Sequence, residues 1–428
     1  MPTKNILALL LFSVTAAALL SACKPVLKSR FISREEVINA PKPATESTGP
    51  GQGRVRALTG GPCYEPASYI PDERYPEHTP LKTLRINFHY MFPRDSMGLA
   101  DTAAALQYTK ELLWAASGDL TNNQKMWLPQ GNNTPVLPIG ISYVLSPQPN
   151  ILNDDGIYFH YDDDLCYYVV KGRHQNNYNR KVIERYAIGM DSIVNFFVIP
   201  HHPDSVASPT YKGSSNGIAL GHAVKLAGYF RESKLDVWHN RQGVNHELGH
   251  VLGLVHAWHN DGCDDTPVNP NCWNRSNTPP CDTEASNNIM DYNAHQAAWS
   301  PCQIGKLHYA IANDRSRERP LAIPTWCHFQ EDKTITIRDT VDWPCQKDLE
   351  GNLIIAPGGM LTVNCRLSIP PAGKITVQPG GSLVLNGSRL HNACGKQWQG
   401  IEVQQEGRIK GEVLVIGDVK IEDAANLN

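Results

Sequence analysis

One stretch of eleven residues carries the strongest chemical signal in the chain. Residues 246–256 read HELGHVLGLVH, with His246 and His250 four residues apart and His256 six residues further on. On a helix, residues four apart share one face, so two imidazole nitrogens can reach one metal ion. Gly253 can adopt the positive φ that ends a helix, which returns His256 as a third ligand. Three protein ligands leave one coordination position open, as in catalytic zinc sites.

Glu247 lies one step round the helix from the first histidine, beside a bound metal rather than on it. A carboxylate in that place can act as a general base toward water. Apolar residues of the same stretch can pack the helix beneath the site, and they are Val244, Leu248, Val251, Leu252 and Val255. The alternative interpretation is a buried helix that carries His and Glu for structural reasons alone.

At these residues the chain resembles the metzincin metallopeptidases. A second motif, SNNIMDY at residues 286–292, resembles the tight methionine turn that lies under the zinc in that group. The segments 261–267 (DGCDDTP) and 288–305 resemble the pappalysin branch, which includes pregnancy-associated plasma protein A and bacterial cytophagalysin-like relatives. The resemblance covers residues 63–316 and is specific from residue 246 to residue 305.

The resemblance implies a role for each motif residue. The three histidines would hold one catalytic zinc ion, Glu247 would be the general base and Met290 the hydrophobic floor. Tyr292 would approach the metal and could donate a hydrogen bond to the oxyanion. Without the family, Tyr292 reads as a core tyrosine and Met290 as core filler. The implied reaction is peptide-bond hydrolysis, in which Glu247 takes a proton from zinc-bound water and passes it to the leaving amine.

The loop between His256 and Met290 is polar and rich in acids. Pappalysin relatives bind calcium near this loop, and four acids could supply the oxygen ligands that calcium prefers: Asp264, Asp265, Asp282 and Glu284. The alternative is solvated loop acids, because the twelve-residue spacing of an EF-hand is absent. His259 and His295 match no motif position, and we expect them at the surface or in supporting roles.

The N-terminus predicts export. After Lys4, residues 6–20 form an apolar run that is too short for an ordinary membrane span and suits a signal-peptide core. Residues 20–23 read LSAC and resemble a bacterial lipobox, in which Cys23 becomes the lipid-modified first residue once residues 1–22 are removed. We therefore expect a membrane-anchored lipoprotein of the bacterial envelope, at the outer membrane or cell surface. The alternative is an ordinary signal peptide followed by a coincidental cysteine.

Ten cysteines remain after Cys23, an even number that favours disulfides in an exported chain. They are Cys63, Cys166, Cys263, Cys272, Cys281, Cys302, Cys327, Cys345, Cys365 and Cys394. Bridges among Cys263, Cys272 and Cys281 would pin the loop after the third histidine. Cys63 has two interpretations: a disulfide partner, or a latency switch that covers the zinc, as in some pappalysin-like proforms.

Length and composition indicate a globular chain of two or three units. The 428 residues carry a formal net charge of −3, and the scattered Lys and Arg form no basic stripe, which argues against nucleic acid as a partner. Residues 23–61 mix Pro, Gly, Ser, Thr and charges and read as a flexible tether. We expect the catalytic domain over 62–325 and a β-rich domain over 333–428.

The catalytic domain is predicted to be α+β: a twisted mixed sheet, the active-site helix and the methionine turn. The expected strands are 84–91, 137–145, 193–199 and an edge strand over 216–222, and the expected helices are 101–116 and one that starts at a Ser300–Gln303 capping box. In metzincins the edge strand pairs with an extended substrate.

Residues 333–428 alternate Val, Ile, Leu and Thr with Gly. PGGMLTV at 357–363 recurs as PGGSLVL at 379–385, an offset of 22 residues that is typical of one coil of a parallel β-solenoid. We read 398–403 as a third, degenerate coil, and a small β-sandwich is the alternative. A solenoid end needs a cap, yet residues 413–421 still read as strand, so we expect this region to be incomplete.

The sequence thus predicts an exported zinc endopeptidase with protein or peptide substrates. One alternative is a binding or adhesion lipoprotein in which the metalloprotease fold is mainly structural. The intact Glu247 disfavours it, because a scaffold needs no general base. The other alternative is a zinc hydrolase whose substrate is not a protein.

Overall fold

The computed structural model describes residues 26–38, 61–98, 101–148, 153–210, 216–230 and 236–427. The chain divides into two compact units. The sheet–helix unit is Thr48–His328 with Pro344–Asp348, and the stacked-strand unit is Met1–Ser47 with Phe329–Trp343 and Leu349–Asn428. The expected signal peptide and Cys23 lie outside the described residues. None of the helices in the described ranges is long and apolar enough to cross a membrane.

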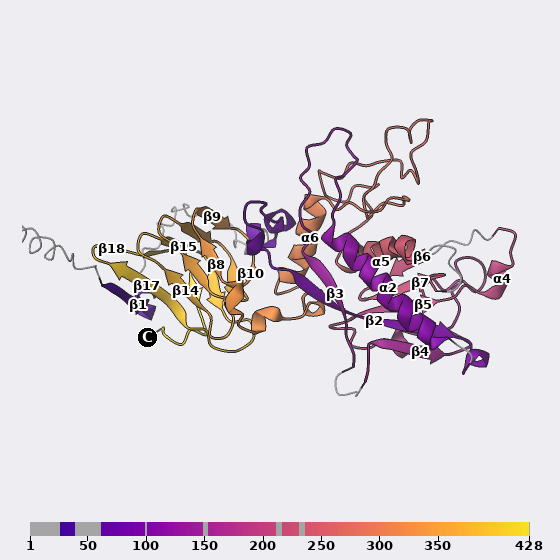
Figure 1. Ribbon diagram of the computed structural model, residues 1–428, viewed down its shortest axis with the longest axis horizontal. Helices are drawn as coiled ribbons and strands as arrows, with labels where there is room; N and C mark the ends of the chain where they lie inside the picture. The colour runs from indigo at the N-terminus through magenta and orange to yellow at the C-terminus, as the bar shows by residue number, and fades with distance from the viewer. Residues whose placement is uncertain are drawn as a thin grey trace, which may run out of the picture. The chain divides into compact units, whose positions relative to one another are not determined.

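A mixed sheet of six strands forms the centre of the sheet–helix unit (Figure 1). Its order is β3-β2-β5-β7-β6, and β4 also pairs with β2. Neighbours run parallel except β6 and β7, which are antiparallel. The bounds are β2 Lys82–Phe92, β3 Ile141–Leu145, β4 Ile157–Tyr161, β5 Val194–Ile199, β6 Asn216–Ala219 and β7 Ala223–Ala227. Strand β6 therefore lies at one edge of the sheet.

Two long helices, α2 (Thr102–Thr121) and α5 (Val237–Val251), pack on one face of this sheet. Tyr90 of β2 shares a 2.7 Å hydrogen bond with Thr109 of α2, and Tyr143 of β3 donates at 2.6 Å to Asn245 of α5. The other helices are α3 Lys181–Tyr186, α4 Pro203–Val206 and α6 Pro301–Ala312. The 3-10 turns are η1 Pro62–Tyr64, η2 Pro66–Tyr69, η3 Pro76–His78, η4 Arg94–Ser96, η5 Arg319–Leu321 and η6 Thr325–Cys327.

The opposite face of the sheet has its own apolar core, in which Met91, Phe197 and Ile199 contact Cys166 and Val182. All six residues of β5 are buried because this strand lies between β2 and β7 and has packed layers on both faces.

Most predicted elements of this unit are present with shifted ends. The predicted strand over 137–145 begins only at Ile141, while Leu137 and Ile139 are buried outside any strand. The capping box at the start of α6 is formed as expected: Ser300 accepts from the amide of Gln303, whose side chain accepts from the amide of Ser300. Strands β4 and β7 were not predicted. Strand β7 reads AVKLA, and all five of its residues are buried. The central lysine interrupts the continuous apolar run that is typical of a strand buried on both faces.

The stacked-strand unit contains three ladders of parallel strands: β8-β11-β14-β17, β9-β12-β15-β19 and β13-β16-β20. Within them Leu353 pairs with Ile375 and Met360 with Ser382, each 22 residues further along. The bounds are η7 Glu331–Lys333, β8 Ile335–Ile337, β9 Thr340–Trp343, β11 Leu353–Ile355, β12 Met360–Val363, β13 Arg366–Ser368, β14 Lys374–Val377, β15 Ser382–Asn386, β16 Arg389–His391, β17 Gly400–Glu406, β18 Ile409–Lys410, β19 Glu412–Ile416 and β20 Lys420–Ile421. The short β10 (Lys347–Asp348) belongs to the sheet–helix unit.

The structure explains the repeated Pro-Gly-Gly of this unit. Gly358 and its equivalent Gly380 have φ of 81° and 79°, a left-handed conformation that favours glycine. The following Gly381 leaves no room for a side chain, because a Cβ there would lie 2.7 Å from the carbonyl oxygen of Ile355 in the preceding layer. A polar ladder marks the same repeat: Asn386 donates to Asn364 at 2.8 Å across 22 residues.

Part of the expected tether is ordered. Residues Leu27–Phe31 form β1, which pairs antiparallel with β17, and α1 (Arg34–Ile38) follows. This corrects the flexible tether predicted over 23–61 for these residues. Strand β1 is held at the edge of the sheet by main-chain hydrogen bonds. These bonds do not depend on the side-chain composition from which the tether was predicted.

Candidate metal centre

Helix α5 presents the first two histidines of the motif. Asp236 caps its start by accepting a hydrogen bond from the amide of His239. His246 is buried, and Leu248 is fully buried beneath it. The helix ends at Val251, and Gly253, with φ of 92°, turns the chain as the sequence predicts. This turn returns His256 toward the helix.

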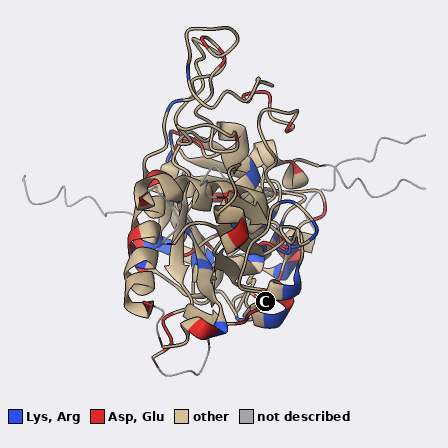
Figure 2. Ribbon diagram, turned by 90° about the vertical axis from the view of Figure 1, so that its right-hand side faces the viewer, with Lys and Arg blue, Asp and Glu red and all other residues tan. Residues whose placement is uncertain are grey.

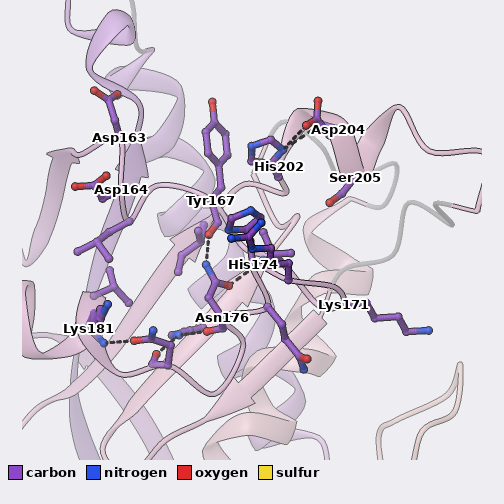
Figure 3. Close-up of a pocket in the computed structure, with 18 of the residues that line it drawn as sticks. Asp163, Asp164, Tyr167, Lys171, His174, Asn176, Lys181, His202, Asp204 and Ser205 are labelled. Carbon is purple, nitrogen blue, oxygen red and sulfur yellow. Dashed lines mark hydrogen bonds and ion pairs between the residues drawn. The ribbon is translucent and has the colours of Figure 1, made fainter.

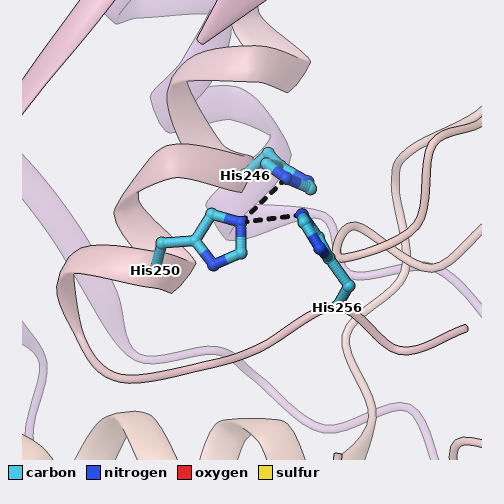
Figure 4. A group of neighbouring side chains, drawn as sticks. All are labelled: His246, His250 and His256. Atoms are coloured by element: carbon cyan, nitrogen blue, oxygen red, sulfur yellow. Dashed lines mark hydrogen bonds between the residues drawn. The ribbon is translucent and has the colours of Figure 1, made fainter. Parts of the chain in front are cut away.

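The three imidazoles meet at one point (Figure 4). Nε2 of His250 lies 3.1 Å from Nε2 of His246 and 3.1 Å from Nε2 of His256. One ligand atom from each of the three lies within 4.8 Å of the others. The structure therefore brings together the three residues that the spacing predicts as metal ligands.

In His246 and His250, a hydrogen bond at Nδ1 determines which ring nitrogen carries the proton. Nδ1 of His246 lies 2.7 Å from the carbonyl oxygen of Ile289, and Nδ1 of His250 lies 2.9 Å from that of Leu254. A carbonyl oxygen only accepts, so each Nδ1 donates and each Nε2 keeps its lone pair. Lone pairs 3.1 Å apart repel each other unless a cation lies between them. The donor set thus fits a metal ion that takes neutral imidazoles, such as zinc.

Burial keeps these histidines neutral. It lowers the pKa of His246 to about 3 and the pKa of His256 to about 4, and in both cases the nearby His250 adds to the effect. Burial also lowers the pKa of His250 itself. Neutral imidazole is the form that binds a metal, so at pH 7 all three are in the ligand state.

Glu247 is buried beside the triad. The main-chain amide of Ala219 donates to its carboxylate, while Oε2 has no hydrogen-bond partner among the described residues. Burial raises the pKa of Glu247 to about 8, and the Ala219 amide partly opposes that rise. A buried carboxylate oxygen without a partner fits a site that takes up water or substrate there.

Met290 lies fully buried under α5. At Gly249 the helix leaves no room for a side chain, because an added Cβ would clash with Sδ of Met290. The turn that carries it is held by Asn288, whose Oδ1 accepts from the amide of Met290 at 2.8 Å. The methionine therefore packs beneath the ligand helix, where the family resemblance places it.

Tyr292 is 49% exposed, so it is not a core tyrosine. Its ring centroid lies 4.9 Å from that of His256 and 5.7 Å from that of His246. Burial raises the pKa of its hydroxyl above the ordinary value. Tyr292 thus lies half-exposed beside His246 and His256 with its hydroxyl protonated at pH 7.

The four acids expected to bind calcium are not brought together. Asp264, Asp282 and Glu284 are exposed, and Asp265 accepts a hydrogen bond from the amide of Cys302 at 3.0 Å. The extra histidines also lie apart from the triad's ligand atoms. His259 accepts from the indole of Trp258 at 2.6 Å, and His295 packs on Trp127 with 5.1 Å between ring centroids.

Disulfides pin the loop after the third histidine. Cys263 bonds Cys302 and Cys272 bonds Cys281. Cys63 is disulfide-bonded, as are Cys327, Cys365 and Cys394. In this structure the sulfur of Cys63 is therefore committed to a bridge and not to the metal. Cys166 and Cys345 are buried free thiols, so not all ten cysteines pair as the even count predicted.

A cavity of about 1230 Å³ lies away from the triad (Figure 3). Its wall includes Tyr167, Asn176 and His202 but none of the three ligand histidines. Lys225 also lines it, and the buried ammonium group of this lysine donates to the carbonyl of Asn176 at 2.8 Å. Burial lowers the pKa of Lys225 to about 8. These bonds anchor the loop that forms one wall of the cavity.

Three residues of the site escaped the sequence analysis. Gly217 of β6 packs against Glu247, Trp258 stacks on His256, and Gln296 donates to the carbonyl of Ile289 at 2.9 Å. Only Trp258 had a local signal, because an aromatic residue two positions after a ligand can reach that ligand's ring.

No protein-family model matches the chain, and no curated protein matches its sequence. Solved structures that are similar to it include two of metallopeptidases. Mirolysin in complex with compound 9 has a TM-score of 0.38 and 15% identity over 57% of this chain and 97% of that chain. A promirolysin mutant from Tannerella forsythia has a TM-score of 0.36 and 15% identity over 57% of this chain and 84% of that chain. With TM-scores below 0.5 and 15% identity, these similarities do not assign a function to the chain.

Proposed function

We propose that the chain is a zinc-dependent endopeptidase of the metzincin type, in the pappalysin branch, that hydrolyses peptide bonds in proteins. One observation carries the proposal: three neutral imidazoles converge through Nε2 beside a buried glutamate that has an unpartnered oxygen. Such a set would hold one zinc ion with an open position for water or substrate.

Zinc, when bound, supplies Lewis-acid chemistry that acidifies water and polarises a carbonyl group. The ionised form of Glu247 would be favoured by a nearby metal cation. In that form its free Oε2 accepts a proton from the attacking water, and the side chain passes that proton to the leaving amine. The amide of Ala219 holds the other side of this carboxylate in place. Tyr292 supplies a hydroxyl for the oxyanion.

The edge strand supports a peptide substrate. Strand β6 lies at the rim of the sheet and directly against Glu247. An extended peptide could pair with this strand by main-chain hydrogen bonds and so present its carbonyl to the triad. In the view of Figure 2, acidic and basic residues are spread over the ribbon rather than gathered in one basic stripe, which gives no support to nucleic acid as a substrate.

The test compares purified wild type with Glu247→Ala on a pool of denatured proteins, with and without a zinc chelator, and reads the cleaved peptides by mass spectrometry. Glu247→Ala should keep its zinc and lose about 10²–10⁴-fold in cleavage rate. The exposed Glu111→Ala on α2 is the matched control and should cleave like wild type. Cleavage by Glu247→Ala at the wild-type rate, or cleavage indifferent to chelation, would rule the proposal out.

For the stacked-strand unit we propose a short parallel β-solenoid that serves as a spacer or as a substrate- or surface-binding module. The parallel pairing of strands in three ladders supports this reading over a β-sandwich, whose sheets are antiparallel. A solenoid that binds a surface or a substrate is also the basis of the second candidate function, a binding or adhesion lipoprotein. That candidate would be favoured if no protein were cleaved by metal-loaded wild type.

We propose further that the protein is anchored by lipid at Cys23 to the bacterial envelope, at the outer membrane or cell surface. The support is the LSAC sequence after an apolar run. Cys23→Ser should move the protein from the membrane fraction to the soluble fraction. Unchanged membrane association of that variant would contradict the anchor.

A further inference from the structure

The three ligand histidines are not supported in the same way. His246 and His250 each donate from Nδ1 to a main-chain carbonyl oxygen, at 2.7 Å and 2.9 Å. Nδ1 of His256 has no hydrogen-bond partner in the described part of the chain. A hydrogen bond from the nitrogen that does not bind the metal usually orients a metal-binding imidazole, so the plane of the third ring must be fixed by a different contact.

The indole of Trp258 lies flat against that ring. The ring centroids of His256 and Trp258 are 3.9 Å apart and their planes are 15° from parallel. Tyr292 closes the arrangement, with its centroid 4.9 Å from that of His256 and 4.3 Å from that of Trp258. His256 is thus confined by one stacked and one edge-on aromatic ring.

Trp258 is itself held by the methionine turn. The amide of Ala257 donates to the carbonyl oxygen of Met290 at 3.1 Å. The indole N–H of Trp258 donates to Nε2 of His259 at 2.6 Å. The main chain just before Trp258 and the indole N–H of Trp258 therefore each have a hydrogen-bond partner that restrains the ring.

We propose that Trp258 is the positioning residue for the third metal ligand: its stacked indole holds the imidazole of His256 toward the metal in place of the missing hydrogen bond. The inference rests on the proposed zinc site. A ligand that is already oriented loses less freedom when the metal binds, so loss of the stack should weaken metal binding.

The experiment measures the zinc dissociation constant of the purified full chain by competition with a chromogenic chelator. Trp258→Leu keeps apolar bulk but removes the ring, and we expect zinc to bind about tenfold more weakly. Trp258→Phe restores a ring and should bind within about threefold of wild type. His259→Ala removes only the acceptor of the indole N–H and should weaken zinc binding less than Trp258→Leu does, because the stacked ring remains. Trp114→Leu, which removes an exposed tryptophan on α2, is the matched control.

The outcomes separate this inference from the proposed function. Wild type that binds no zinc would refute the metal site itself. Wild-type affinity in Trp258→Leu, or equal losses in Trp258→Leu and Trp258→Phe, would refute the stacking role alone.

If circular dichroism shows that Trp258→Leu is unfolded, the test becomes the quenching of tryptophan fluorescence by cobalt, measured in wild type and in Trp258→Phe. Wild type should lose emission as cobalt binds, because one indole lies against a ligand ring. Trp258→Phe should lack that component. Equal quenching in the two proteins would overturn the proposal.

Discussion

Gly217 of the edge strand packs directly against Glu247 of helix α5. A Cβ at position 217 would stand 2.7 Å from Cγ and 2.8 Å from Cδ of the glutamate. Two residues along, the amide of Ala219 donates to the same carboxylate. The strand that we propose pairs with substrate therefore also holds the proposed general base, so substrate alignment and proton transfer depend on one element.

Gly217→Ala should lower kcat/KM by about a hundredfold, the usual effect of a misplacement of about 1 Å. The added methyl group has no room, so either β6 moves outward or Glu247 leaves its rotamer. The zinc content should not change, because Gly217 does not contact the histidines. Steady-state kinetics on a peptide identified from the protein pool, together with metal analysis, check both parts.

Gly118→Ala on α2 is the matched control, since a Cβ there has no atom within 4 Å. A double-mutant cycle with Glu247→Asp, whose carboxylate is one methylene shorter, isolates the contact. Gly217→Ala should cost less in the Glu247→Asp background than in wild type. Equal costs in the two backgrounds would show that the glycine acts elsewhere.

Met290→Ala should lower the free energy of unfolding by about 2–5 kcal/mol, because it leaves a cavity under α5. Met290→Leu conserves most of the volume and should cost less than about 1.5 kcal/mol. Urea denaturation of the zinc-free protein measures both. If Met290→Ala were as stable as wild type, Met290 would not be the packed floor of the site.

Gln303→Glu should destabilise the fold more than Ser300→Ala does. Asn288 and Gln303 exchange two buried hydrogen bonds, of 2.8 Å and 3.0 Å, and so tie the start of α6 to the methionine turn. Glutamate cannot donate to Oδ1 of Asn288, which keeps only the amide of Met290. We expect the lost bond to cost about 1 kcal/mol, with a further cost for the buried charge. Ser300→Ala loses an N-cap worth about 1 kcal/mol. Equal unfolding midpoints for the two variants would contradict this ranking.

The protein should lose stability as the pH falls from 6.5 to about 4. Burial lowers the pKa of His89 to about 3 and the pKa of His160 to about 4, and their facing nitrogens lie 2.9 Å apart. In the unfolded chain both titrate near pH 6.5. Across this window the unfolded state binds more protons than the folded state, so the free energy of unfolding falls with pH, by up to about 1.4 kcal/mol per pH unit for each histidine.

Other groups face this pair. The amide oxygen of Asn195 lies 3.0 Å from Nε2 of His89, Tyr186 stacks on His160, and the charge of Asp162 opposes the shift at His160. His160→Gln removes one titrating ring. Thermal unfolding between pH 7 and pH 4.5 should therefore show a shallower decline in this variant. Parallel curves for variant and wild type would assign the acid sensitivity to other groups.

The sequence predicted the parts of the site that local rules decide. His246 and His250 share a helix face because of their spacing, and Gly253 ends the helix because it tolerates positive φ. The capping box of Ser300 and Gln303 follows from the same kind of rule. These predictions hold because each depends on residues within one or two helical turns.

Contacts between distant segments could not be predicted. Whether Cys63 forms a disulfide or covers the metal site depends on which group the fold brings near its sulfur. The acids proposed for calcium, such as Asp264 and Glu284, are exposed, whereas Asp291, which was not considered, is buried. Burial depends on packing against other segments and leaves little trace in the residue's own neighbourhood.

By itself the sequence predicted the histidine triad, the helix that carries two of its members and the 22-residue repeat of the C-terminal region. Spacing alone places side chains on one face of a helix or in one layer of a stack. Only the tertiary structure decided that Gly217 and Ala219 contact Glu247 and that the Trp258 ring stacks on His256. Gly217 lies thirty residues from Glu247 in the chain. Such contacts form only where the packing of the whole unit offsets the entropy of bringing the segments together.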